Sequence, residues 1–270
     1  MESVEMNKAI DVLAERILKS GVQPVTCKFQ PVFDCFSAQV VAYLGNVYVS
    51  GSSLGVLSPD DYIPVVAKAE KGLELLTVAL EDFSLEASSL SPDLYRVEFF
   101  SFPASNDLLK SDKIYYSLSA IIANYPFLKG KICLCFSGDI LNEDEALLSK
   151  AFSDIRSAGI KVGIKNFGDK FMPVSLLGIV PPDYLFLNEE ETIKSEDKKL
   201  FAPVGALIKY ASNLGIKTIA LRAKSDKGIR ELSLVECFGT TVCPSYSGLR
   251  YFAEPSTLTS VMSVKEVDEQ

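Results

Sequence analysis

Histidine and tryptophan are both missing from this chain of 270 residues. Without histidine the chain has no imidazole general base, no Ser-His-Asp triad and no His-ligated zinc site. Positive charge is also scarce, because 27 Lys and Arg residues stand against 35 Asp and Glu residues, a formal net charge of −8. Sequence-independent binding of nucleic acid needs a cationic surface. The composition therefore argues against nucleic acid as a partner.

Long hydrophobic runs are absent as well. The sequence contains no run of about 18 apolar residues, which is the length needed to cross a bilayer. Residues 1–8 also lack the basic-then-apolar order of a secretion signal. We therefore expect a cytoplasmic protein that makes no contact with a membrane.

None of the six cysteines belongs to a Cys-x-x-Cys pair. We predict free thiols in a reducing compartment rather than a disulfide framework. Cys133 and Cys135 alternate within one apolar run, and we expect their side chains on opposite faces of a strand. Cys135 and Cys243 are interpreted as inert buried thiols, because the chain has no histidine to activate them.

The chain does contain enough apolar material for a sizeable core, since 48% of its residues are hydrophobic and 23% are charged. Residues 6–18 repeat apolar side chains at helical spacing, and Gly21 follows as a stop signal. We divide the chain into an N-terminal capping helix (residues 1–22), a barrel (residues 23–258) and a C-terminal helix end or tail (residues 259–270). A second interpretation makes the first helix the end of a signalling helix that follows an upstream module.

Apolar, β-branched runs predict strands, and apolar residues at helical spacing predict helices. The expected strands are residues 25–33, 39–49, 94–102, 131–136, 160–164, 184–187, 216–221 and 240–242. The expected helices are residues 59–83, entered through Ser58, residues 142–157, capped by Asn142, and residues 201–214 and 226–235. Strands that alternate with helices pair in parallel through right-handed crossovers. About eight strands in one chain favour an α/β fold of the (β/α)8 TIM-barrel type over an open doubly wound sheet.

In such a barrel, chemistry takes place at the carboxyl ends of the strands. A site for a divalent metal at this end needs oxygen ligands. The side chains at the expected strand ends are mainly apolar, and they include Leu134, Cys135, Phe186, Leu221 and Cys243. We therefore expect neither a metal nor another cofactor there.

Several short motifs resemble those of a known family, in the order and spacing of that family. They are Phe29-Gln30-Pro31-Val32-Phe33-Asp34, Val40-Val41-Ala42-Tyr43, Gly55-Val56-Leu57-Ser58-Pro59, Phe167-Gly168, Asp183-Tyr184-Leu185 and Ala253-x-Pro255. Over about residues 25–258 the chain resembles EAL domains, the bacterial phosphodiesterases of cyclic di-GMP. The resemblance implies a modified (β/α)8 barrel of the EAL type, in which the first strand runs antiparallel.

The same resemblance assigns positions to the catalytic and metal-binding residues of the family. The signature Glu falls on Leu44, the metal-binding Asn on Ser101, the paired Asp on Lys165 and Asn166, and the Lys on Phe186. A further Glu falls on Leu134, the late Glu on Lys224 and the final Gln on Cys243. The family hydrolyses a phosphodiester with two divalent ions, which need hard oxygen ligands. The resemblance therefore implies a degenerate domain without catalytic residues.

We therefore expect a catalytically inactive EAL-like domain that serves as a regulatory or protein-interaction module in bacterial signalling. The expected partner is another protein. The resemblance to the family also implies a homodimer. The loop at residues 165–168 is interpreted either as part of such an interface or as a plain turn.

A second hypothesis is a receptor that binds cyclic di-GMP without cleaving it. Gln30, Tyr48 and Phe171 are its candidate ligand-binding residues, and the two aromatic rings would stack on guanine. Lys165 and Lys224 would offer charge to a phosphate, although only as point charges. The phosphate-facing Arg of the family falls on Tyr48, and this loss weighs against binding. Gln30 also has a structural interpretation, as a strand-end residue bonded to its neighbours, and an active phosphodiesterase is a third hypothesis.

Overall fold

The structure, a computed structural model, describes residues 25–51, 55–90, 94–167, 173–244, 246 and 254–263. The helix expected over residues 1–22 lies outside these ranges. The same is true of Phe171, which was proposed as a ligand-binding residue, and of Gly168 in the loop after the expected strand at residues 160–164.

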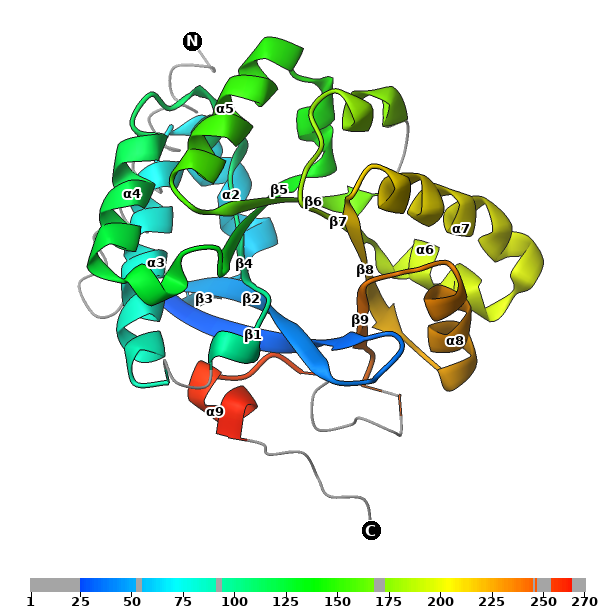
Figure 1. Cartoon of the computed structure of the whole chain (residues 1–270). Coiled ribbons are helices and arrows are strands. Elements are labelled where there is room, and N and C mark those ends of the chain that lie inside the picture. Colours follow the sequence, from blue (N-terminus) through cyan, green and yellow to red (C-terminus); the bar gives the residue numbers. More distant parts are fainter. Residues whose placement is uncertain are drawn as a thin grey trace.

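Eight strands form a closed ring in the order β1-β9-β8-β7-β6-β5-β4-β2, and β2 pairs with β1 to complete it. They are β1 (Val25–Asp34), β2 (Val40–Gly51), β4 (Phe100–Pro103), β5 (Ile132–Ser137), β6 (Lys161–Phe167), β7 (Tyr184–Leu187), β8 (Lys217–Ala223) and β9 (Gly239–Val242). β1 runs antiparallel to both of its neighbours, whereas the other neighbours in the ring are parallel. The short strand β3 (Gly55–Leu57) pairs with the far end of β2. The predicted α/β barrel of the EAL type is therefore confirmed (Figure 1).

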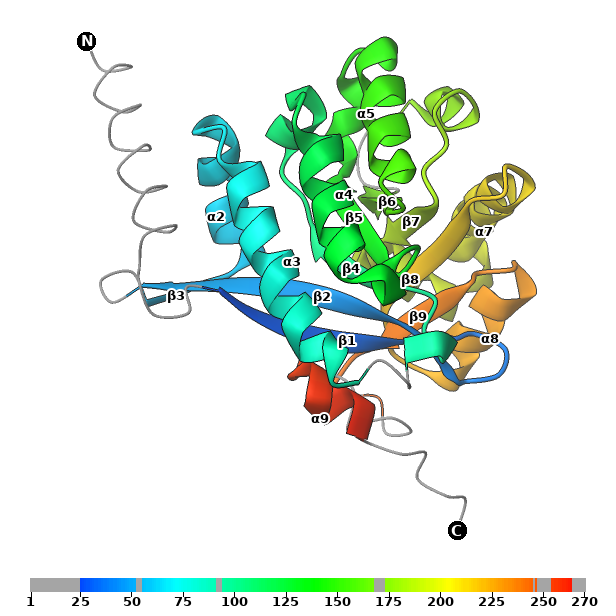
Figure 2. The ribbon, with the colours of Figure 1, turned by 60° about the vertical axis from the view of Figure 1, so that its left-hand side comes forward.

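Helices cover the outside of this ring (Figure 1). They are α2 (Pro59–Lys68), α3 (Gly72–Ser88), α4 (Ile114–Asn124), α5 (Glu145–Ser157), α6 (Glu189–Ile193), α7 (Lys198–Asn213), α8 (Asp226–Leu234) and α9 (Leu258–Ser263). Short 3-10 turns lie at η1 (Leu94–Arg96), η2 (Asn106–Lys110), η3 (Pro126–Leu128), η4 (Gly138–Asn142), η5 (Val174–Gly178) and η6 (Lys194–Glu196). Figure 2 shows α3 crossing the long β1–β2 hairpin and ending beside α9, and both helices contact β1 and each other. Within the described ranges no helix is long and apolar enough to cross a membrane.

The single helix expected over residues 59–83 is wrong. Glu70 has a left-handed backbone (φ 53°) and separates α2 from α3. The next helix begins at Gly72, where an added Cβ would lie 1.9 Å from the Ser105 Oγ, so a larger residue would displace that side chain. The start of α2 is confirmed, because the Ser58 amide donates to the Asp61 carboxylate (2.9 Å) in a capping box.

Two other boundaries also differ from the sequence-based expectation. The strand expected over residues 94–102 begins only at Phe100, since η1 occupies its first turn. Asn142 does not cap the following helix. Instead the Asp144 carboxylate accepts a hydrogen bond from the Leu147 amide (3.0 Å), and α5 begins at Glu145. Both segments are apolar on one face, and this pattern fixes the type of element better than its end.

All six cysteines are buried free thiols, as predicted. The expectation that Cys133 and Cys135 face opposite sides of their strand is wrong. Their sulfur atoms lie 3.9 Å apart inside the barrel, because residues two apart in a strand point to the same face.

The interior of the ring, called the lumen below, is filled with apolar side chains. They are Val32, Ala42, Leu44, Phe99, Cys133, Cys135, Tyr184, Phe186 and Ile219. Gly163 on β6 leaves room for them, since a Cβ there would lie 2.7 Å from the Phe186 ring and 2.9 Å from the Cys135 sulfur. The lumen is therefore a packed core and not a pore.

Candidate functional site

The carboxyl ends of the parallel strands carry the positions that the sequence singled out. Leu44 on β2 pairs in register with Ser101 on β4, and the Ser101 hydroxyl accepts a hydrogen bond from the Gly45 amide (3.2 Å). Leu44 and Phe186 belong to the apolar cluster of the lumen. Lys165 follows the inward-facing Gly163 by two residues, so it points to the same side. The structure thus brings Leu44, Ser101, Lys165 and Phe186 to one end of the lumen.

The other four positions lie outside this group. Leu134 packs in the outer core, and Cys133 and Cys135 take the inward places of β5 instead. Asn166 is exposed on a left-handed backbone (φ 58°). Lys224 and Cys243 complete the set. Lys224 forms an ion pair with Glu189 at the surface (3.5 Å), and Cys243 is buried just beyond the end of β9, where its amide donates to the Ala223 carbonyl (3.1 Å).

Two of the three candidate ligand-binding residues lie on the β1–β2 hairpin. Gln30 is buried, and its side-chain amide donates to the Val242 carbonyl (3.3 Å). Tyr48 follows Leu44 by four residues on the same face of β2, beyond the point where β2 pairs with β4. The Lys28 ammonium lies 5.4 Å from the centre of the Tyr48 ring, within the range of a cation–π contact.

The inward groups of this end are weakly polar, and one of them is cationic. Burial raises the pKa of the Cys133 thiol well above its usual value. Burial also disfavours the thiolate of Cys135, but contacts with Cys133, with the Lys165 ammonium and with the Ser101 hydroxyl lower its pKa. Lys165 is thus a charged group close to Cys135, and it forms no ion pair with any described residue.

The chemistry of the EAL family calls for a pair of divalent cations, and the donors at this end do not fit them. Such ions take carboxylate, amide or carbonyl oxygens. This end offers two hydrocarbon side chains, Leu44 and Phe186, together with the thiols of β5, the Ser101 hydroxyl, the Lys165 ammonium and the Gln30 amide, whose nitrogen donates to the Val242 carbonyl. Among the described residues no three His, Cys, Asp or Glu side chains are arranged to hold a metal ion.

Sequence reasoning missed a charged pair on the rim of this end. The Glu189 carboxylate, at the start of α6, lies 2.8 Å from the Arg222 Nε. Arg222 also has a left-handed backbone (φ 61°), at the place where the pairing of β8 with β9 shifts register. The only sequence signal was the position of Glu189, two residues after the end of a strand. Strained backbone near the end of a strand is common at functional sites.

A closed ring of eight strands with an antiparallel first member defines the class of this fold. The family model for the EAL domain matches residues 18–239, well over half of the chain. The chain therefore belongs to the EAL domain family.

Solved structures with the same fold share little sequence with this chain. The EAL enzyme Bd1971, in its cAMP- and cyclic di-GMP-bound form, is 15% identical with a TM-score of 0.79, over 97% of this chain and 69% of that one. The PaMucR phosphodiesterase in complex with c-di-GMP is 12% identical with a TM-score of 0.76, and the match covers 92% of this chain and 99% of that one. LapD of Vibrio cholerae, an S helix-GGDEF-EAL structure bound to c-di-GMP, is 12% identical with a TM-score of 0.72. The match covers 88% of this chain and 56% of that one. No curated protein matches the sequence.

Proposed function

We propose that this EAL-family chain does not hydrolyse cyclic di-GMP and instead works as a regulatory module that binds protein in cyclic di-GMP signalling. The carrying observation is the filling of the lumen end where the family performs its reaction. Leu44 and Phe186 belong to a packed apolar cluster there, and Lys165 places a positive charge beside them. Neither a metal-bound water nor a phosphate clamp can form without oxygen ligands for the ions.

Turnover and metal content test this proposal directly. We expect no cleavage of cyclic di-GMP above the buffer rate with Mg2+ or Mn2+, measured by chromatography of the products. After gel filtration in plain buffer we expect no stoichiometric divalent ion. Cleavage that depends on Mn2+, or one ion bound per chain, would refute the loss of the reaction.

The protein-binding part of the proposal is supported by the tip of the β1–β2 hairpin. Phe36 is 91% exposed there. The Asp34 carboxylate holds the turn, because it accepts hydrogen bonds from the Phe36 amide (3.0 Å) and the Ser37 amide (2.6 Å). The ring therefore projects from a preorganised turn, which reduces the entropy lost when a partner binds.

A hollow of about 450 Å³ lies beside this ring, between the hairpin and α8. Its apolar lining includes Ala38, Ile229 and Leu234, and Leu234 is 64% exposed. Phe36 and these three residues are called the Phe36 surface below. A protruding aromatic ring next to an apolar hollow is typical of the centre of a protein interface.

A second copy of this chain is the occupant that we propose for the Phe36 surface. A two-fold interface requires one patch to contain both halves of each contact, and here the ring and the hollow lie side by side. The charges match in the same way. Arg230 lines the hollow and forms no ion pair with described residues, and Asp34 supplies a carboxylate at the same place.

Light scattering over a range of concentrations tests this interface. We expect the wild-type chain to form a dimer and Phe36→Ser to shift it to a monomer. Leu85→Ser is the matched control, because Leu85 is 65% exposed on α3 and does not line the hollow. A chain that stays monomeric at all concentrations, or a dimer that survives Phe36→Ser, contradicts a second copy as the occupant.

The alternative function is a receptor for cyclic di-GMP that lacks hydrolysis. It is favoured by the cations around the carboxyl end, namely Lys165 in the lumen and Lys28 beside the Tyr48 ring. Calorimetric titration with cyclic di-GMP, with and without Mn2+, separates the two functions. A saturable heat without Mn2+ would favour the receptor, and Tyr48→Ala should then weaken it. The absence of heat favours the protein-binding module.

A further inference from the structure

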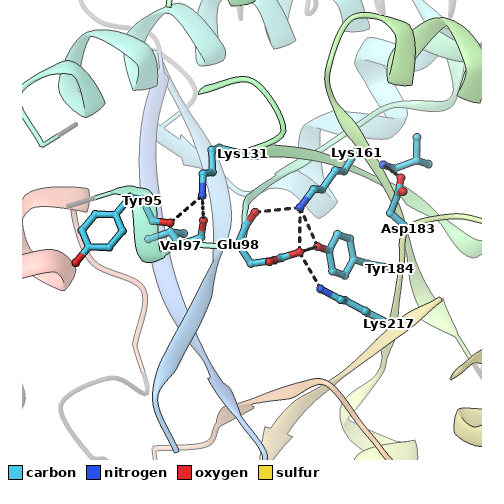
Figure 3. Close-up of polar contacts among 9 residues, drawn as sticks. Tyr95, Val97, Glu98, Lys131, Lys161, Asp183, Tyr184 and Lys217 are labelled. Carbon is cyan, nitrogen blue, oxygen red and sulfur yellow. Dashed lines mark hydrogen bonds and ion pairs between the residues drawn. The ribbon is translucent and has the colours of Figure 1, made fainter. Parts of the chain in front are cut away.

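The amino ends of the strands carry a polar network at the opposite end of the barrel. Glu98 lies two residues before β4, and Lys161, Tyr184 and Lys217 are the first residues of β6, β7 and β8. Figure 3 shows the last three side chains pointing toward the Glu98 carboxylate. Three neighbouring strands and the segment before β4 thus contribute to a single cluster.

One oxygen of Glu98 accepts most of these contacts. Its Oε1 accepts from the Lys217 ammonium (2.8 Å), the Tyr184 hydroxyl (2.9 Å) and the Lys161 ammonium (3.1 Å). Lys161 also donates to the Glu98 carbonyl (3.1 Å). A single negative charge therefore lies between two positive ones.

Two further cations increase this excess of positive charge. Among the described residues, the Lys131 ammonium donates to the carbonyls of Tyr95 and Val97 (Figure 3). Burial and the neighbouring Lys161 lower its pKa, although Glu98 opposes them. Arg156 forms an ion pair with Asp183 (3.2 Å). Four cations thus face two carboxylates, in a chain whose net charge is −8.

A hollow of about 320 Å³ opens on this cluster. Its charged lining consists of Glu98, Arg156, Lys161, Asp183 and Lys217. The Lys217 ammonium has only two partners among the described residues, the Glu98 carboxylate and the Phe238 ring at 4.5 Å from its centre. The Arg156 Nε and Nη2 already donate to the Asp183 carboxylate and the Pro181 carbonyl. The remaining N–H donors of Lys217 and the Nη1 group of Arg156 have no partner among the described residues, and they can bind a ligand in the hollow.

We propose that this hollow binds the phosphate group of a small anionic ligand. Arg156 and Lys217 donate to the phosphate oxygens, and Lys161 and Lys131 contribute charge. Guanidinium and ammonium N–H groups are the usual donors to phosphate oxygens. The anion would also relieve the repulsion between neighbouring cations, which the single Glu98 carboxylate does only in part. The site lies at the opposite end from the family reaction and does not depend on the proposed function.

Phosphorus NMR titration tests the site, with inorganic phosphate and glycerol phosphate as probes and chloride to keep the ionic strength equal. We expect saturable binding of a probe with a Kd on the order of 1 mM or below. Lys217→Gln should weaken it about tenfold, because it removes one charge-assisted hydrogen bond. Lys209→Gln, which makes the same charge change at an exposed site on α7, should not weaken it. Tighter binding of glycerol phosphate identifies a phosphorylated metabolite as the ligand, and tighter binding of inorganic phosphate identifies the free ion.

A second variant separates a binding site from a purely structural network. Glu98→Gln removes the carboxylate that competes with the anion, so we expect it to bind phosphate more tightly than the wild type. Its melting temperature should fall in chloride and recover in phosphate. Glu74→Gln, an exposed change on α3, is the control and should show neither effect. An equal loss for Glu98→Gln in both salts, no saturable binding, or the same weakening in both lysine variants would overturn the proposal.

Discussion

The lysines at the two ends of the barrel differ in their ion pairs. At the amino end, Lys161 and Lys217 share the Glu98 carboxylate. At the carboxyl end, Lys165 lies among apolar groups and forms no ion pair with described residues. The carboxyl end of such a barrel is normally the place of chemistry, and the amino end contributes mainly to stability.

Strand β6 carries both arrangements on one face. Lys161 and Lys165 are four residues apart, so both point inward. The first closes the polar network, and the second extends from the packed lumen toward the rim. The same residue type therefore contributes differently to stability at the two ends, because neighbouring segments supply a carboxylate partner at one end and none among the described residues at the other. Three substitutions or conditions sharpen this comparison, in order of decreasing effect.

A carboxylate placed back at the carboxyl end should give the largest effect. Leu44→Glu buries a charge in the apolar cluster of the lumen, where pairing with Lys165 at the same end does not offset the cost of removing the carboxylate from water. We expect a loss of more than about 3 kcal/mol in the free energy of unfolding, measured by urea denaturation. Mn2+ should not restore the loss, because the other oxygen ligands are also missing. Leu44→Met is the size-matched control and should cost less than about 1.5 kcal/mol. Recovery of stability with Mn2+ would show that this end still holds a metal.

The two lysines of β6 give a matched pair. Lys161→Met removes one of the two cations bound to Glu98 and leaves the Tyr184 hydroxyl without its lysine donor. We expect a loss of about 1–2 kcal/mol, because the pair is partly exposed and screened by solvent. Lys165→Met should change stability by less than about 0.5 kcal/mol or increase it, since a partnerless ammonium leaves the lumen. Urea denaturation of both variants measures the difference. Equal losses would mean that the two ends do not differ.

The strands of the ring could be predicted from the sequence, and one of them shows why. The run at Tyr184–Leu187 was predicted with its observed bounds, because it is short, apolar and bounded by Asp183 and Asn188. Helix boundaries were harder. The break at Glu70 depends on a left-handed backbone and on the close approach of Gly72 to Ser105. The spacing of apolar residues in the sequence indicates neither feature.

Which side chains face the lumen depends on the register between the strands, and only the structure gives this register. Leu134 was assigned to a ligand position, yet it faces outward, and Cys133 and Cys135 face the lumen. A strict reading of the alternation from Lys161 through Gly163 to Lys165 would have placed both lysines inside. The network around Glu98 was out of reach, because its members lie up to 119 residues apart in the sequence and meet only when the ring closes.

Acid should weaken the amino end by a smaller amount. Burial alone would raise the pKa of Glu98, but hydrogen bonds from Lys217 and Tyr184 and the charge of Lys161 lower it to about 2. A folded pKa below the unfolded value of about 4.5 means that the stabilisation is complete above pH 4.5. It is then lost as the pH falls from 4.5 toward 2. Because the side chain is 37% exposed, we expect only about 1 kcal/mol from this group between pH 7 and pH 3.

Urea denaturation of the wild type and of Glu98→Gln, at pH 7 and at pH 3, isolates this contribution from the other carboxylates. The gap between the two proteins should narrow at pH 3, because the unfolded wild type then takes up a proton at Glu98, which favours unfolding, whereas the amide of the variant takes up none. Glu74→Gln should keep a constant gap from the wild type, since Glu74 contacts only Lys71 at the surface of α3. If the gap for Glu98→Gln stays the same at both pH values, the Glu98 carboxylate does not stabilise the amino end, and the contrast between the two ends of β6 cannot be electrostatic.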